Sequence, residues 1–258
     1  MSTLDGKTAV ITGASRGLGR QLALDFARVG VAKLVLVARS ADALARVRSE
    51  VRAVAPGTEV VAVSADLARG EEVARVAATA LAALGGRLDV LVNNASALGP
   101  TPMPFLLDYP PDDFRRVLDT NLVAPFLLIR QLLPALVERG GSIINVTSDA
   151  GVVGYPGWGA YGISKSGIEG LSRTWAAELD GSGVRVNWVD PGAMNTAMHR
   201  AAEPDEDPAQ WADPAAVTGV FLYLASDESR GVSGRRFLAQ APDWGRGAET
   251  ASAGGTHP

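Results

Sequence analysis

Cysteine is absent from this chain of 258 residues, and histidine occurs only as His199 and His257. A chain without cysteine forms no disulfide bond and holds no metal through thiolates. Two histidines also give little support to a multi-histidine metal site, or to a hydrolase that relays protons through a serine–histidine pair. We therefore expect no metal centre and no hydrolase of that type.

The chain also lacks an excess of positive charge, since 24 Lys and Arg residues face 28 Asp and Glu residues for a formal net charge of −4. A protein of that charge has little attraction for the phosphate backbone of a nucleic acid. Residues 1–7 contain no long apolar stretch of the kind that marks a secretory signal, and no later apolar run is as long as a membrane span. These absences predict a cytoplasmic protein that binds neither nucleic acid nor membrane.

Short apolar runs alternate with segments of helical periodicity over residues 7–240. The expected strands are 7–12, 33–38, 59–64, 89–93, 142–147, 184–189 and 236–238. The expected helices are 17–29, a segment between Ser40 and Pro56, 71–84, 112–139, 159–179 and 214–225. Strand–helix alternation with nearly continuous apolar strands is typical of a parallel sheet covered on both faces. We expect a doubly wound, three-layer α/β/α Rossmann fold with about seven strands.

No linker rich in proline, glycine or serine divides this pattern, so we expect one domain over residues 1–244. Residues 245–258 are small and polar, and they predict a disordered tail. Pro125 and Pro134 lie within the helical segment 112–139, where each removes a backbone donor. We expect kinks or a break there.

Three glycines, Gly13, Gly17 and Gly19, lie between the first expected strand and the first expected helix. A dinucleotide site needs glycines in this place, because the main chain must approach the pyrophosphate closely and the helix N-terminus offers free N–H groups. The spacing G-x-x-x-G-x-G differs from the general G-x-G-x-x-G pattern, so an ordinary strand-to-helix turn is the alternative. The position of the glycines favours the dinucleotide interpretation.

Arginine stands where an NAD-binding chain usually has an acidic residue. About 20 residues past such glycines, an Asp or Glu commonly holds the ribose hydroxyls, whereas this chain has Arg39 twenty residues after Gly19. Arg16, within the glycine loop, is a second cation near the same position, and guanidinium groups bind phosphate well. Both arginines could instead be solvated surface residues. Together they favour NADP(H) over NAD(H).

Tyr161 and Lys165 are four residues apart in an expected helix, so they lie on one face on successive turns. A free tyrosine has a pKa near 10, and a nearby ammonium group favours the phenolate and lowers that pKa. The pair therefore predicts an acid/base site, although the same spacing occurs by chance in surface helices.

These motifs together resemble the short-chain dehydrogenase/reductase family, in its short single-domain branch. The resemblance covers about residues 5–240 and rests on motifs that occur in the family's order and approximate spacing. The motifs are Thr12–Gly19, Asp66-Leu67, Asn93-Asn94-Ala95, Asn121, Ser148, Tyr161 with Lys165, and Pro191-Gly192. The resemblance implies reversible reduction of a carbonyl to an alcohol by an NADP(H)-dependent oxidoreductase.

The resemblance also implies a role for each matching residue. Ser148 would bind the substrate oxygen, and Tyr161 would exchange a proton with it. Lys165 would lower the tyrosine pKa and hold the nicotinamide ribose, and Asn121 would support a water-mediated proton path. The implied cofactor contacts are Gly13, Ser15, Arg16, Gly17, Leu18, Gly19, Arg39, Asp66, Leu67, Asn93, Ala95, Tyr161, Lys165, Pro191, Gly192, Met194 and Thr196.

Some of these residues also have ordinary structural interpretations. Thr147 is a hydroxyl competitor of Ser148, and Asn121 could be an amide inside a helix that satisfies backbone groups. Asp66 could be a helix N-cap as well as an adenine contact. His199 is expected to be solvated rather than catalytic. Asp190 departs from the family, which more often has a small residue before Pro191.

A substrate lid is expected at about residues 193–212, after Pro191-Gly192. The apolar side chains expected around the substrate are Met194, Met198, Trp211, Leu98, Val153 and Tyr155. They favour an apolar or aromatic ketone, although they could instead pack the lid against the body. The acidic run 203–208 disfavours anionic substrates.

Three rival interpretations share this fold. Enoyl reductases are similar, but they usually space the tyrosine and lysine further apart. A nucleotide-sensing regulator, or a structural subunit of a larger assembly, would be expected to lose Tyr161 or Lys165, and both are present. The family resemblance further implies a homodimer or homotetramer formed through the helices at 112–139 and 159–179.

Overall fold

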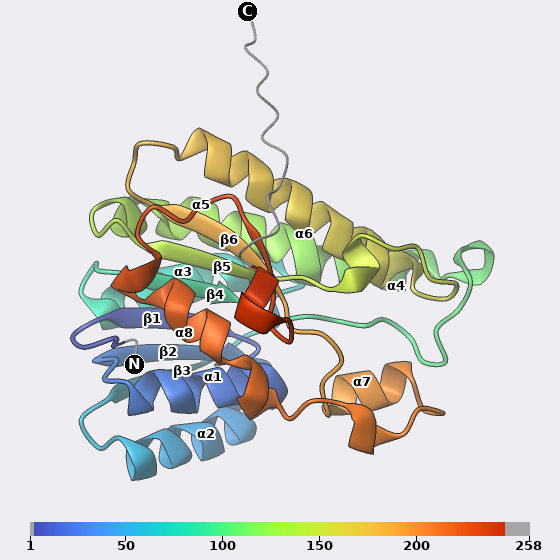
Figure 1. Cartoon of the computed structure of the whole chain (residues 1–258), viewed down its shortest axis with the longest axis horizontal. Helices are drawn as coiled ribbons and strands as arrows, with labels where there is room; N and C mark the ends of the chain where they lie inside the picture. The colour runs from blue at the N-terminus through green and yellow to red at the C-terminus, as the bar shows by residue number, and fades with distance from the viewer. Residues whose placement is uncertain (1–2, 246–258) are drawn as a thin grey trace, which may run out of the picture.

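The computed structural model describes residues 3–245, and its centre is a sheet of seven parallel strands (Figure 1). The strands are β1 Thr8–Thr12, β2 Lys33–Ala38, β3 Glu59–Ser64, β4 Val90–Asn93, β5 Ser142–Val146, β6 Arg185–Asp190 and β7 Arg236–Leu238. Their order is β3-β2-β1-β4-β5-β6-β7, and every neighbouring pair is parallel. The order reverses between β1 and β4, which is the arrangement of a doubly wound sheet. The predicted fold class is confirmed.

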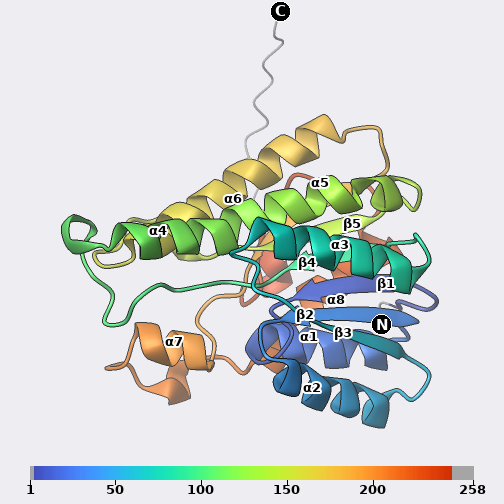
Figure 2. The same ribbon diagram turned by 180° about the vertical axis from the view of Figure 1, so that it is seen from behind.

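Helices cover both faces of the sheet, as Figure 2 shows from behind. The helices are α1 Gly17–Arg28, α2 Ala41–Val54, α3 Gly70–Leu84, α4 Pro111–Leu118, α5 Ala124–Val137, α6 Gly159–Glu178, α7 Ala197–Ala202 and α8 Gly219–Ala225. α1, α2 and α8 lie on one face, and α3, α5 and α6 lie on the other. α7 lies beyond the edge of the sheet (Figure 1).

Side chains of the central strands alternate between two apolar cores. Ala9 and Ile11 of β1 belong to the core under α1, α2 and α8, whereas Val10 belongs to the core under α3 and α5. Successive side chains of a strand point to opposite faces, so a strand buried on both faces is apolar at every position. This accounts for the continuous apolar runs in the sequence.

The ends of the helices follow the expected chemistry in several places. The Ser40 hydroxyl accepts a hydrogen bond from the Ala43 N–H at 3.2 Å and caps α2. Gly85 ends α3 in the left-handed conformation, with φ of 64°. Asp66 does not cap α3, because that helix begins at Gly70 and the Asp66 carboxylate accepts instead from the Ala68 N–H.

The helical segment expected at 112–139 is interrupted where one of the prolines predicts it. A π-helical turn, Asp119–Val123, separates α4 from α5, and Pro125 lies in the first turn of α5. A proline cannot donate to the carbonyl four residues before it, and a wider turn accommodates that loss. α5 continues through Pro134 to Val137.

The helical stretch Pro111–Val137 is long enough, and apolar enough over part of its length, to cross a membrane by length and composition alone. In the fold this stretch packs against α3 and α6, as the core helix of a water-soluble domain does.

The helix expected at 214–225 is also divided. A 3-10 turn, Pro214–Val217, precedes α8, and the Asp213 carboxylate accepts from the Ala215 N–H at 2.8 Å. Beyond residue 245, the predicted disordered tail lies outside the described residues.

Candidate active site

A cleft of about 1120 Å³ opens at the edge of the sheet where the strands end. The predicted site residues that line it are Gly13, Ser15, Arg16, Gly17, Leu18, Arg39, Asp66, Leu67, Ala95, Ser148, Tyr161, Lys165, Pro191, Gly192, Met194 and Thr196. They follow the carboxyl ends of six neighbouring strands, β1 to β6, or lie on α1 and α6. Parallel strands bring such residues together, and ligands of doubly wound sheets bind at this edge.

The glycine loop after β1 is shaped by close backbone contacts. Gly13 has φ of +67°, and a Cβ atom there would lie 2.8 Å from the Ala95 Cα. At Gly19 a Cβ atom would lie 2.4 Å from the Gly13 carbonyl oxygen. Gly19 does not itself line the cleft, and it packs α1 against the loop. The loop therefore brings bare backbone to the cleft at the start of α1, as a pyrophosphate site requires.

Exposed arginines surround the end of the cleft that lies beside the glycine loop. Arg16 and Arg39 both line it, and Arg46 on α2 lines it as well. Within residues 3–245, no carboxylate forms an ion pair with any of these three guanidinium groups. Unpaired guanidinium groups beside a glycine loop suit a phosphate ester, because they bind its oxygens by charge-assisted hydrogen bonds.

Arg116 on α4 is a fourth guanidinium group at the cleft, and it is paired with Asp66 at 2.8 Å. Neither Arg46 nor Arg116 was singled out from the sequence. Arg46 lies within an ordinary amphipathic helix, and only the fold brings Arg116 to Asp66, 50 positions away.

Tyr161, Lys165 and Ser148 meet at the other end of the cleft. Lys165 is 3% exposed, and its Nζ lies 5.3 Å from the centre of the Tyr161 ring. The ammonium group donates to the Val146 carbonyl at 2.9 Å, which ties α6 to the end of β5. The Ser148 hydroxyl donates to the Asp149 carboxylate at 2.8 Å, and Asp149 also accepts from Tyr155 at 3.0 Å.

Burial is the main influence on the two titrating groups. It raises the pKa of Tyr161, an effect that a hydrogen bond with Ser148 opposes and that the charges of Asp190 and Asp149 reinforce. Burial lowers the pKa of Lys165 to about 8, and Asp190 opposes this shift. The pKa of Tyr161 is therefore raised rather than lowered as expected, because removal of the phenol from water has the largest effect on it.

Two of the predicted asparagines lie away from the cleft. Asn121, 3% exposed, exchanges hydrogen bonds with both backbone groups of Ala97 and donates to the Ser164 hydroxyl. Asn93 is buried in β4, donates to Asn145 at 2.8 Å, and does not line the cleft. Its neighbour Asn94 lines the cleft and donates to the Thr12 carbonyl at 2.9 Å. The alternation of side chains along a strand explains this exchange.

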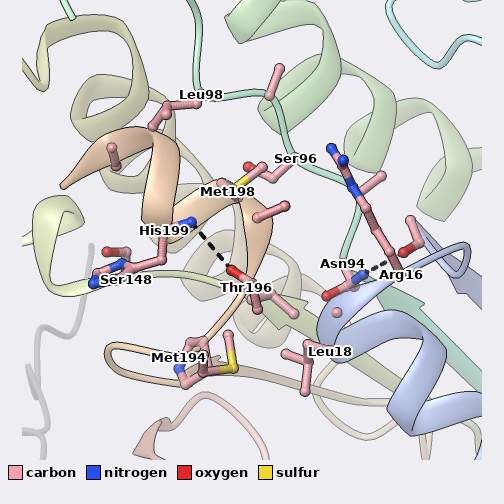
Figure 3. A pocket seen from close by; sticks show the side chains of 18 of the residues that line it. Arg16, Leu18, Asn94, Ser96, Leu98, Ser148, Met194, Thr196, Met198 and His199 are labelled. Atoms are coloured by element: carbon pink, nitrogen blue, oxygen red, sulfur yellow. Dashed lines mark hydrogen bonds between the residues drawn. The ribbon is translucent and has the colours of Figure 1, made fainter. Parts of the chain in front are cut away.

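The segment expected to form the lid, 193–212, is held together at its base. The Asn195 N–H donates to the Ala212 carbonyl at 2.9 Å, and the Ala212 N–H donates to the Ala193 carbonyl at 3.1 Å. Between these bonds, α7 faces the glycine loop across the cleft, with Thr196 capping α7 through the His199 N–H (Figure 3). The base hydrogen bonds fix where the lid leaves the body.

The apolar residues predicted around the substrate divide into two groups. Leu98, Tyr155, Met194 and Met198 line the cleft. Val153 and Trp211 do not line it. The Trp211 ring instead packs at a right angle to His199, with centres 4.4 Å apart. His199 lines the cleft, and its side chain is 21% exposed.

A family model for the short chain dehydrogenases matches residues 7–207. The chain belongs to the short-chain dehydrogenase family. It is 37% identical to a 3-oxoacyl-[acyl-carrier-protein] reductase of Synechocystis over 92% of this chain and 96% of the relative. The predicted family and enzyme class, a short-chain oxidoreductase, are confirmed.

Solved structures of short-chain dehydrogenases share the fold over nearly the whole length. One from Pseudomonas syringae has a TM-score of 0.86 at 37% identity and covers 93% of this chain and 96% of its own. Another, from Escherichia coli CFT073, was solved in complex with NADPH and has a TM-score of 0.85 at 31% identity, over 93% of this chain and 99% of its own.

Proposed function

We propose that this short-chain dehydrogenase reduces a ketone to an alcohol with NADPH, or catalyses the reverse oxidation, with Tyr161 as the acid/base. The observation that carries the proposal is the meeting of Tyr161, Ser148 and Lys165 in one cleft with the glycine loop. The name of the Synechocystis relative, a reductase of 3-oxoacyl groups, describes the same kind of reaction.

The described residues fit NADP(H). Gly13 and Gly17 bring backbone without side chains to the cleft, where a pyrophosphate could bind, and Arg16, Arg39 and Arg46 offer charge for a ribose 2′-phosphate. A relative of the same fold binds NADPH. When bound, the nicotinamide supplies the hydride that reduces the carbonyl carbon.

The remaining chemistry belongs to side chains of this protein. Ser148 and Tyr161 hydrogen-bond the carbonyl oxygen and stabilise the charge that develops on it. The Tyr161 phenol then gives its proton to the alkoxide. Lys165, held by the Val146 carbonyl, places a positive charge beside the phenol and would hold the nicotinamide ribose. Asn121 joins the π-helical turn Asp119–Val123 to Ser164 of α6 and to the Ala97 backbone. In this position it would support a water-mediated proton path behind Lys165.

The walls of the cleft support an apolar or aromatic substrate. The rings of Tyr155, Trp158 and Tyr161 follow one another edge to face, with centres 6.3 Å and 5.5 Å apart, and Leu98 and Met198 are nearby. Such surfaces bury a flat or aliphatic group beside the reacting carbonyl. We further propose a cytoplasmic homodimer or homotetramer of one domain, residues 1–244, with 193–212 as its substrate lid.

The test measures NADPH consumption, through the absorbance of NADPH, with a panel of apolar and aromatic ketones. NADH serves as the cofactor control. Loss of a general acid lowers rates by about 10²–10⁴-fold, so Tyr161→Phe should lose at least a hundredfold in kcat. The same variant should bind NADPH within about threefold of the wild type, since the arginines at the other end are untouched. NADPH binding without turnover on any ketone would favour a non-catalytic regulatory or structural subunit instead.

A further inference from the structure

A buried pair of carboxylates lies behind the candidate catalytic residues. Glu169 on α6 is 5% exposed and Asp190 at the end of β6 is 6% exposed. Arg236 of β7 joins them, with its Nε donating to Glu169 at 3.0 Å and its other nitrogen donating to Asp190 at 2.9 Å. The same guanidinium group donates to the Ser148 carbonyl at 3.3 Å. One arginine thus satisfies three acceptors from three segments.

Each of these acceptors is also bonded to a part of the candidate site. The second oxygen of Asp190 accepts from the Gly192 N–H at 2.9 Å, which shapes the turn after β6. Glu169 accepts from the Thr147 hydroxyl at 2.9 Å, one residue before Ser148. Glu169 also follows Lys165 by four residues, so it lies one turn further along the same face of α6. The connected elements therefore carry Ser148, Lys165 and the turn beside the cleft.

The chemistry of the network calls for arginine. Two buried carboxylates without a cation would be strongly unfavourable, because neither is solvated. Arg173 lies 3.7 Å from Glu169, whereas the cation paired with Asp190 is Arg236. A guanidinium group presents several donors in a fixed plane and can bind two carboxylates and a carbonyl at once, whereas an ammonium group is a point charge.

We propose that Arg236 is a positioning residue for the reaction, and that it holds Ser148, the Pro191-Gly192 turn and α6 in their working geometry through Asp190 and Glu169. The kinetic part of this proposal rests on the proposed function. Its structural part does not, because the geometry of the turns can be followed without turnover.

The network also sets the electrostatic surroundings of Tyr161. The charged groups that face the phenol are Lys165 on α6, Asp149 after β5, Asp190 on β6 and, through Asp190, Arg236 on β7. Removal of the Asp190 charge should lower the pKa of Tyr161, because that charge raises it. Removal of the Arg236 charge leaves Asp190 uncompensated and should raise it. Opposite shifts from two partners are not expected of a purely structural contact.

The first experiment is amide hydrogen exchange on the full chain, comparing Arg236→Gln, Asp190→Asn and the control Arg235→Gln. Arg235 is exposed and immediately precedes Arg236, the first residue of β7. In Arg236→Gln, exchange should rise by about tenfold or more in peptides spanning 147–151 and 190–193. In Asp190→Asn it should rise only in 190–193, and the control should match the wild type. Unchanged exchange in both variants would overturn the proposal.

The second experiment measures kinetics on the same proteins. Arg236→Gln should lose at least about tenfold in kcat while its KM for NADPH stays within about threefold. In the direction of reduction, which needs the protonated phenol, the decline at high pH should move to lower pH in Asp190→Asn and to higher pH in Arg236→Gln. A loss no greater than that of Arg235→Gln would overturn the kinetic role.

The two readouts separate the proposals. A wild type without turnover on any ketone would refute the proposed function, and the exchange data would still decide the role of Arg236. If Arg236→Gln fails to fold, the role of the network is decided by Asp190→Asn, which keeps the Arg236–Glu169 pair. Increased amide exchange at 190–193 in that variant would support the network, and exchange equal to that of the wild type would overturn it.

Discussion

Reversal of the charge at Arg39 should change which nicotinamide cofactor this enzyme prefers. Arg39 lies at the end of β2, is exposed, and lines the cleft beside Arg16. A hydrogen bond to a charged group contributes about 1.5–3 kcal/mol, and the exposure of this site favours the lower end. About 1.4 kcal/mol corresponds to tenfold in affinity. Arg39→Ala should therefore weaken NADPH binding by about tenfold and leave NADH binding nearly unchanged.

Arg39→Asp should have a larger effect, because a carboxylate repels a 2′-phosphate and can accept hydrogen bonds from the ribose hydroxyls of NADH. Arg52→Ala is a matched control, since Arg52 is exposed on α2 and does not line the cleft. The assay is a fluorescence titration of each variant with NADPH and with NADH. An unchanged ratio of the two dissociation constants in Arg39→Asp would refute the phosphate clamp.

Three further predictions concern the stability of the site and its scaffold. Gly13→Ala should lower the thermal midpoint of unfolding and weaken NADPH binding more than tenfold, because the added Cβ would lie 2.8 Å from the Ala95 Cα. The control is Gly57→Ala, whose Cβ would meet no atom within 4 Å, so its thermal midpoint and NADPH affinity should match those of the wild type. Lys165 has its pKa lowered from 10.5 to about 8, so its burial opposes folding below pH 8 and no longer does so above pH 10.5. The stability of Lys165→Met relative to wild type should thus fall as pH rises from 8 to 10.5 in urea titrations. Arg185→Met should cost about 2–3 kcal/mol by urea unfolding, because the buried Arg185 donates to the carbonyls that end α8; a loss under 1 kcal/mol would contradict this.

Local sequence signals were sufficient for the fold and for much of the site. The continuous apolar run of β1 indicated a strand buried on both faces, and Ser40 indicated the start of α2. The glycines at 13, 17 and 19 marked the loop before α1, because only a residue without a side chain tolerates such close backbone contacts. The spacing of four residues was sufficient to predict Tyr161 and Lys165 on one face of a helix.

Local patterns were insufficient where the outcome depended on which face or partner a residue meets. Asn93 and Asn94 are adjacent, and only the pleat of β4 decides that Asn94 reaches the cleft while Asn93 pairs with Asn145. The balance between burial and charge at Tyr161 likewise depends on what packs around the phenol.

The sequence by itself determined the order of strands and helices, the glycine loop and the Tyr161–Lys165 pair, because each depends on residues close together in the chain. Only the tertiary structure decided that Asp190, Glu169 and Arg236 form one network behind them. Arg236 is 46 and 67 positions from its two partners, and its neighbours in space are set by the pairing of β6 with β7. Long-range ion pairs of this kind leave no periodic pattern in the sequence. An arginine can occur in any strand, and only the packing of the strands determines whether it meets a carboxylate.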